Sequence, residues 1–135
     1  MDAALCRELK EAFSADRSVV LLDGDFSCLE FNELVKNFAY LVASRFHSIV
    51  HAFKNGTPCI ALGWATKYAD LLTLFGQEQY VLDFRDEIGA GAVSSAIEKM
   101  DSAYQEESAK IRKKLVSVQE QNVFDVITQY QKELP

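Results

Sequence analysis

Residues 40–62 of the chain read YLVASRFHSIVHAFKNGTPCIAL and carry the pattern of a strand, a helix and a second strand. The apolar runs at 40–43 and 59–62 indicate two short buried strands. Between them, apolar residues recur at helical spacing. Gly56 is expected to end the helix because glycine adopts the left-handed cap conformation without a steric penalty, and Pro58 prevents continuation.

The start of this helix combines groups that favour an anion. Ser44 is the predicted N-cap, since its hydroxyl can accept from a free amide of the first turn. The unpaired N–H groups of that turn and the positive end of the helix dipole attract negative charge. Arg45 adds a bidentate cation, and His47 adds a titratable donor. We therefore predict that Ser44, Arg45 and His47 bind an anionic ligand.

Composition limits the class of protein. The 135 residues suit one domain, and the net charge of −6 argues against binding to nucleic acid. Cys6, Cys28 and Cys59 are odd in number and lie in or beside apolar segments, so we expect reduced, mostly buried thiols. No apolar run approaches the roughly 20 residues of a membrane span. We expect a cytoplasmic protein without a membrane span, a metal or a cofactor.

Helical segments are predicted on both sides of the central unit. Residues 2–13 place apolar side chains opposite charges, which indicates an amphipathic helix. Ser27 and Glu30 have the spacing of a capping box that opens a second helix. The predicted buried side of that helix comprises Leu29, Leu34, Val35 and Phe38. Thr66 is the predicted N-cap of a further helix, which Gly76 closes.

Four short apolar runs are the predicted strands, at residues 18–22, 40–43, 59–62 and 80–83. Strands that alternate with helices predict a parallel sheet, and continuous apolar strands indicate helices on both faces. We predict an α/β fold, with a Rossmann-like three-layer domain at residues 1–88 and a helical C-terminal extension at 89–135. The apolar stripe of the extension is thin, so we expect it to pack on another domain or subunit.

Two features of the chain predict partners. Four strands are few for a doubly wound domain, and the first helix has no strand before it, so we expect a piece or a reduced relative of a longer protein. The edge of an incomplete sheet tends to pair with another strand. We therefore expect a homodimer or a higher oligomer.

The sequence contains Ser44-Arg45-Phe46-His47, then Gly56-Thr57-Pro58, then Gly63-Trp64-Ala65-Thr66-Lys67-Tyr68. In this order and approximate spacing, these motifs resemble the C-terminal half of the polysaccharide pyruvyl transferase family. The resemblance runs from about residue 21 to residue 83, and the tail is only loosely similar. It implies a half-domain similar to those of GT-B glycosyltransferases, with the active site in the cleft between two Rossmann-like halves.

The resemblance implies transfer of the enolpyruvyl carbons of phosphoenolpyruvate to a sugar of a cell-surface polysaccharide, as a pyruvate ketal. Arg45 and His47 match the residues implicated in holding phosphoenolpyruvate. Ketal formation needs an acid for the methylene carbon and a base for a hydroxyl proton, so His47 is the predicted catalytic residue, although it can instead bind only the phosphate. Lys67 and Trp64 complete the predicted substrate site; Lys67 can also face solvent, and Trp64 can also cap the core.

The sequence has no counterpart of the family's N-terminal half, which holds the acceptor site. We expect the isolated chain to be inactive and to need that half or another subunit. Two other functions stay open. A nucleotide-sugar GT-B glycosyltransferase commonly uses a carboxylate on this helix, yet no Asp or Glu occurs from Arg45 to Gly56. A non-catalytic binding or interaction module is favoured by the missing half and the long charged tail. His51, one turn after His47, is expected to pack and not to bind a metal.

Overall fold

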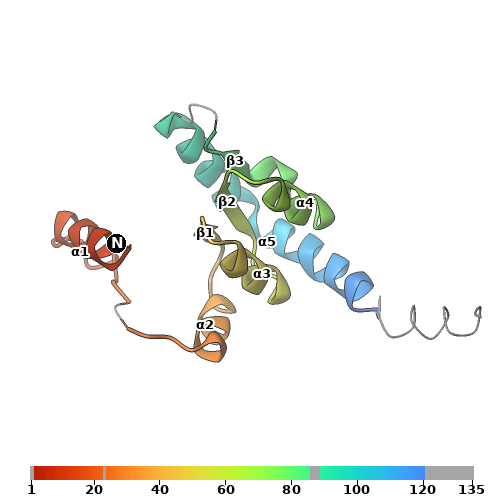
Figure 1. Ribbon diagram of the computed structural model, residues 1–135, viewed down its shortest axis with the longest axis horizontal. Coiled ribbons are helices and arrows are strands. Elements are labelled where there is room, and N and C mark those ends of the chain that lie inside the picture. The colour runs from red at the N-terminus through yellow and green to blue at the C-terminus, as the bar shows by residue number, and fades with distance from the viewer. Residues whose placement is uncertain (1, 23, 86–88, 121–135) are drawn as a thin grey trace, which may run out of the picture. The chain divides into compact units, whose positions relative to one another are not determined.

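The computed structural model describes residues 2–22, 24–85 and 89–120 of the chain (Figure 1). The chain separates into two compact units, Met1–Glu30 and Phe31–Pro135. The second unit contains the whole β-sheet. None of the helices in the described residues is long and apolar enough to cross a membrane.

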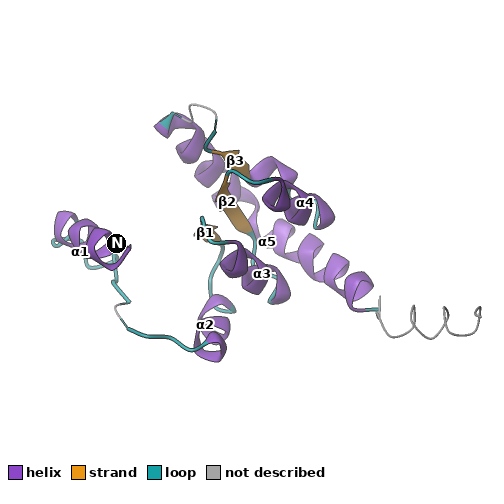
Figure 2. Cartoon of the chain, in the orientation of Figure 1, coloured by secondary structure: helices purple, strands orange, loops and turns teal. Residues whose placement is uncertain are grey.

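The first unit begins with α1 (Asp2–Ala12), which confirms the helix predicted at residues 2–13. The strand predicted at residues 18–22 is wrong, because this stretch is an irregular segment (Figure 2). At its start, the amide and the hydroxyl of Ser18 both donate to Oδ1 of Asp16, at 2.9 and 2.6 Å. A β-branched run has a preference for strands, but a strand is stabilised by cross-strand neighbours, and this run pairs with none of the three strands of the sheet.

The capping box at the start of α2 (Cys28–Val35) is confirmed. The amide of Ser27 donates to Oε2 of Glu30 at 2.9 Å, and the amide of Glu30 donates to Oγ of Ser27 at 3.3 Å. The hydrogen bonds from Ser27 favour the charged carboxylate and lower the pKa of Glu30. Ser27 and Glu30 therefore satisfy each other's backbone donors at the helix start.

The buried side of α2 differs from the prediction. Leu29 and Phe38 are exposed, whereas Val35 is fully buried and Phe31 packs against the core. Thr57 Oγ1 donates to the carbonyl of Val35 at 2.9 Å and holds the end of the helix. The helix stops at Val35, so Phe38 lies beyond it and does not share its apolar face.

Three parallel strands form the sheet in the order β1-β2-β3. They are β1 (Leu41–Ala43), β2 (Cys59–Gly63) and β3 (Val81–Asp83). The parallel pairing confirms the prediction for the strands near 40–43, 59–62 and 80–83. The sheet has three strands in the described residues instead of the four predicted, and the molecule is a mixed helix and strand structure compatible with an α/β fold.

The remaining helices lie between the strands or, for the last of them, after β3. They are α3 (Phe46–Lys54), α4 (Thr66–Leu74), the short 3₁₀ helix η1 (Glu78–Tyr80) and α5 (Ala90–Gln119). The N-caps predicted for two of them are wrong: the cap positions are Arg45 and Ala65, and neither makes a side-chain cap hydrogen bond. Ser44 lies one residue before the cap of α3, and Thr66 is already the first helical residue of α4, so neither hydroxyl is at the capping position.

Glycines end α3 and α4 in the same way, as predicted. Gly56 has a φ of 73°, and the amide of Thr57 donates to the carbonyl of Ala52 at 2.9 Å. Gly76 has a φ of 68°, and the amide of Gln77 donates to the carbonyl of Leu72 at 2.8 Å. These bonds span six residues around a left-handed glycine, the arrangement of a Schellman motif. Each glycine turns the chain back toward the next strand.

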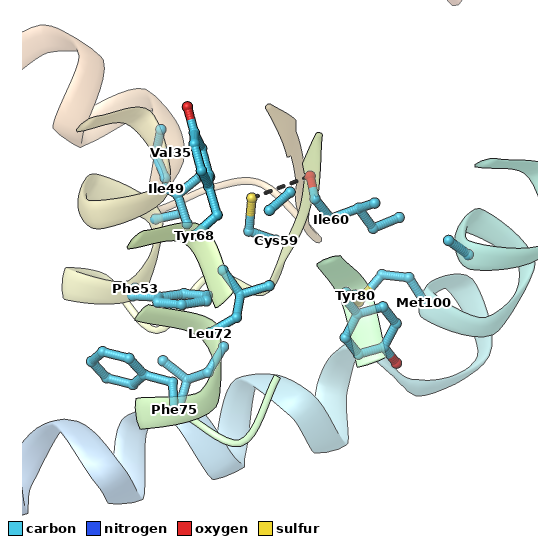
Figure 3. Packing of buried hydrophobic residues seen from close by; sticks show 14 residues of the cluster. Val35, Ile49, Phe53, Cys59, Ile60, Tyr68, Leu72, Phe75, Tyr80 and Met100 are labelled. Atoms are coloured by element: carbon cyan, nitrogen blue, oxygen red, sulfur yellow. Dashed lines mark hydrogen bonds between the residues drawn. The ribbon is translucent and has the colours of Figure 1, made fainter. Parts of the chain in front are cut away.

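Helix α5 packs on the sheet and on α3 within the second unit (Figure 1). The buried core contains Val35, Ile49, Ala52, Phe53, Cys59, Ile60, Ala61, Tyr68, Leu72, Phe75, Tyr80, Ala96, Met100 and Ile111 (Figure 3). The last three of these belong to α5. The hydroxyl of Ser108 donates to the carbonyl of Gly56 at 2.7 Å. Part of the apolar stripe of residues 90–119 is therefore covered by the chain itself, whereas Val116 is 58% exposed. The expected later stripe at residues 123–134 lies outside the described residues.

Candidate functional site

The predicted site residues follow strands β1 and β2 at the carboxyl edge of the sheet. Ser44 and Arg45 come directly after β1, and Trp64 comes directly after β2. Because β1 and β2 are parallel neighbours, their carboxyl ends meet at the same edge, which is where open α/β sheets bind ligands. The structure therefore places the two predicted motifs on adjacent loops.

A direct hydrogen bond joins these loops. The hydroxyl of Tyr68, in the first turn of α4, donates to the carbonyl of Ser44 at 2.8 Å. The Tyr68 ring also lies 5.7 Å from the Phe46 ring, centroid to centroid, in an edge-to-face arrangement with an interplanar angle of 88°. The first turns of α3 and α4 are thus in contact.

Arg45 and His47 are both exposed at the start of α3. Arg45 occupies the N-cap position with an extended backbone, φ −96° and ψ 120°. His47 is the second residue of the helix, and its ring lies 6.0 Å from the Phe46 ring in an edge-to-face contact. The first-turn amides, a guanidinium and an imidazole therefore occupy one end of α3, where negative charge is favoured.

Lys67 reaches the same place from α4. Its Nζ lies 5.0 Å from the centroid of the Phe46 ring and 5.7 Å from that of Tyr68. These distances are those of cation–π contacts. The structure therefore brings Lys67 beside the first turn of α3, although twenty residues separate it from His47 in the sequence.

Trp64 lies in the loop between β2 and α4 with 67% of its surface exposed. Such exposure favours the interpretation of Trp64 as a wall of the site over that of a core cap. A large exposed aromatic side chain at the carboxyl edge can provide a wall for a ligand, because its face is available for stacking.

The last residue of β3 adds a carboxylate that is already paired. Gly63 of β2 pairs in register with Asp83 of β3, so Asp83 lies at the same edge. Its carboxylate accepts from Nε of Arg85 at 3.0 Å and from the amide of Arg85 at 3.0 Å. Hydrogen bonds from Arg85 hold the pKa of Asp83 below its usual value. Asp83 and Arg85 thus offset each other's charge.

Sequence reasoning missed the roles of Phe46, Gly63 and Tyr68. An ideal Cβ built on Gly63 would lie 2.5 Å from Cγ of Tyr68, so only glycine leaves room for the ring. The signal in the sequence was a glycine at the end of an apolar run with a tyrosine five residues later. Such a pattern also fits ordinary core packing, which is why it did not stand out.

His51 has a packing role, as expected. Its ring makes an edge-to-face contact with Phe31, 5.8 Å between centroids, and its Nδ1 lies 3.3 Å from Oδ1 of Asn32. Asn55 Nδ2 donates to the same Asn32 oxygen at 2.7 Å. Within residues 2–22, 24–85 and 89–120, no three His, Cys, Asp or Glu side chains gather as they would around a metal ion.

The three cysteines are free thiols, but the expectation that most are buried is wrong. Cys6 and Cys28 are exposed, and only Cys59 is buried. Both exposed cysteines belong to the first unit, where large apolar side chains such as Leu9 and Leu29 are exposed as well. Burial raises the pKa of the Cys59 thiol to about 12, so at neutral pH this group is protonated and is a poor nucleophile.

Two hollows are lined by other residues. One, of about 190 Å³, lies in the first unit against Cys6, Leu9, Lys10, Val19, Val20 and Leu21. The other, of about 300 Å³, is lined by Lys110, Lys113, Lys114 and Ser117 of α5. Lys110 Nζ is 2.9 Å from Glu106 Oε1 and 3.2 Å from Glu107 Oε1, so part of this basic cluster is locally neutralised. Such ion pairs are typical of a solvated helix face.

Comparison of the chain with protein-family models, curated proteins and solved structures finds no match. Function is therefore inferred from the sequence motifs and from the geometry of the carboxyl edge.

Proposed function

We propose that the chain is the donor-binding domain of a pyruvyl transferase and that phosphoenolpyruvate binds at the carboxyl edge of β1 and β2. The observation that carries the proposal is the position of Lys67, whose Nζ lies 5.0 Å from the ring of Phe46, the residue between Arg45 and His47. Three groups that can hold positive charge therefore surround the first turn of α3.

Phosphoenolpyruvate carries a phosphate and a carboxylate, and each requires charge-assisted hydrogen bonds. In the proposed complex, the planar fork of Arg45 and the first-turn amides of α3 hold one anionic group. Lys67 approaches from α4 as a point charge and neutralises the other. Trp64, exposed in the loop between them, provides an apolar wall.

His47 is the proposed acid or base. Ketal formation adds two sugar hydroxyl oxygens to the central carbon of phosphoenolpyruvate. One proton goes to the methylene carbon, which becomes a methyl group, and the bond from the central carbon to the phosphate oxygen breaks. The second hydroxyl proton leaves with phosphate or a base. An imidazole near neutral pH can donate the first proton or accept the second, or can bind the leaving phosphate.

The same proposal includes a fold type for the second unit and a partner that completes the active site. The second unit serves as a Rossmann-like half of a GT-B-like enzyme in the cytoplasm. The saccharide acceptor and the other wall of the cleft come from a further domain or subunit. The nucleotide-sugar alternative is weaker, since α3 has no carboxylate to hold ribose hydroxyls.

Calorimetric titration of phosphoenolpyruvate tests the proposal. Arg45→Ala should weaken binding about tenfold, the equivalent of one charge-assisted hydrogen bond. Lys54→Ala is the matched control, because Lys54 is an exposed cation at the opposite end of the same helix. It should bind as the parent does. A parent protein that takes up no phosphoenolpyruvate at millimolar concentration, or equal losses in both variants, contradicts the assignment.

A further inference from the structure

Two aromatic rings lie between the proposed ligand groups. Phe46 is half-buried in the first turn of α3, and Tyr68 is buried in the first turn of α4. Neither side chain has a charge to offer an anion. Their contacts nevertheless include Lys67, His47 and the carbonyl of Ser44, the residue before Arg45, which gives them a role beyond filling the core.

We propose that Phe46 and Tyr68 are positioning residues that fix Lys67 and the Arg45 turn in one arrangement before phosphoenolpyruvate binds. This inference rests on the proposed function. Its structural basis is the contact of Lys67 with both rings and the hydrogen bond from Tyr68 to Ser44.

Tyr68 fixes the turn that carries Arg45. Its ring lies against Gly63, at the end of β2, where an added Cβ would come within 2.5 Å of Cγ of the ring. From this position its hydroxyl donates at 2.8 Å to the carbonyl of Ser44, the residue before Arg45. A rigid ring packed on the sheet therefore sets the backbone from which the Arg45 side chain extends.

Phe46 fixes Lys67. The Phe46 ring meets Tyr68 edge-to-face and faces Nζ of Lys67 at 5.0 Å. A lysine side chain loses much rotamer freedom when a ligand orders it, and this loss weakens binding. A lysine that is already held over two rings loses less. The cation–π contact thus prepares Lys67 over the same Phe46 ring that His47 meets in an edge-to-face contact.

The first part of the test uses the protein without ligand. Protons on Cε of Lys67 should resonate upfield of those of an exposed lysine, because they lie over the Phe46 and Tyr68 rings. Phe46→Leu should remove most of this upfield shift. Tyr68→Phe keeps an aromatic ring at position 68, so the shift should persist in that variant. A parent Lys67 at the position of an exposed lysine overturns the inference even if phosphoenolpyruvate binds, so this failure is separate from failure of the proposed function.

The second part is a double-mutant cycle on phosphoenolpyruvate affinity. Phe46→Leu should weaken binding about three- to fivefold, the equivalent of one exposed cation–π contact. In a Lys67→Met background the same substitution should have almost no effect. An equal loss in both backgrounds means that Phe46 has only a structural role and overturns the inference.

Thermal melting checks that each variant is folded. If Phe46→Leu does not fold, Tyr68→Phe substitutes for it: the affinity should fall while the Lys67 shift stays, and an unchanged affinity overturns the role of Tyr68.

Discussion

Phe53→Ala should lower the free energy of unfolding by about 3–5 kcal/mol, the range for removing a large aromatic side chain from a packed core. Phe53 is 1% exposed on the inner face of α3, and its ring lies 4.8 Å from the Phe75 ring, centroid to centroid (Figure 3). Truncation leaves a cavity between α3 and the end of α4. Urea unfolding followed by circular dichroism measures the loss.

Phe84→Ala is the matched control for this prediction. Phe84 follows β3 and is 51% exposed, so its truncation removes little buried area. We expect a loss below about 1 kcal/mol for such a surface position. Similar losses for Phe53→Ala and Phe84→Ala would show that the core is not centred on α3.

Glu107→Ala should lower the free energy of unfolding by about 2–3 kcal/mol, because it removes the carboxylate acceptor of a buried amide and leaves that amide only a longer bond to the carbonyl of Gly76. Glu107 is 4% exposed on α5, and its Oε2 accepts from Nε2 of Gln77 at 2.6 Å. Gln77 is fully buried, and its Oε1 has no hydrogen-bond partner in the described residues. Loss of Glu107 would remove the acceptor of the Gln77 Nε2 hydrogen bond, at the contact between α5 and the loop after α4.

Glu106→Ala is the matched control, because it removes a carboxylate of the same charge from an exposed position. Glu106 is the neighbouring carboxylate on α5, and it also pairs with Lys110, at 2.9 Å, but its side chain is 72% exposed. Exposed ion pairs contribute about 0–1 kcal/mol, so Glu106→Ala should be nearly neutral in urea unfolding. Equal losses for Glu106→Ala and Glu107→Ala would contradict the buried Gln77–Glu107 contact.

The strands near residues 40–43, 59–62 and 80–83 could be predicted because short apolar runs alternate with helices that end at Gly56 and Gly76. The run at 18–22 has the same composition but no strand neighbour, and a strand depends on its neighbour as much as on its own residues. Composition along a chain does not reveal which runs will pair.

The position of α5 could not be predicted for a related reason. Its apolar stripe is interrupted by polar residues that look like a solvated face in the sequence. Two of these polar residues make tertiary hydrogen bonds and do not face solvent alone. Glu107 accepts from Gln77, and Ser108 donates to the carbonyl of Gly56. Their partners lie 30 and 52 residues away in the chain, beyond the reach of any local pattern.

For the candidate site, topology placed Arg45, His47 and Lys67 at one edge of the sheet, as residues after neighbouring parallel strands must be. The hydroxyl of Ser44 was expected to cap α3. Instead, the carbonyl of Ser44 accepts a hydrogen bond from the hydroxyl of Tyr68. Tyr68, which makes that contact, is indistinguishable in the sequence from a core aromatic. Helix starts shift by a residue more easily than strands change order.

The most direct test of the anion site follows the His47 ring and the first-turn amides of α3 by nuclear magnetic resonance while phosphoenolpyruvate is added. We expect saturable shifts at His47, with the amides at the far end of α3, near Lys54, unchanged. Shifts spread evenly over the second unit, or a His47 ring that does not respond at millimolar ligand, would contradict it.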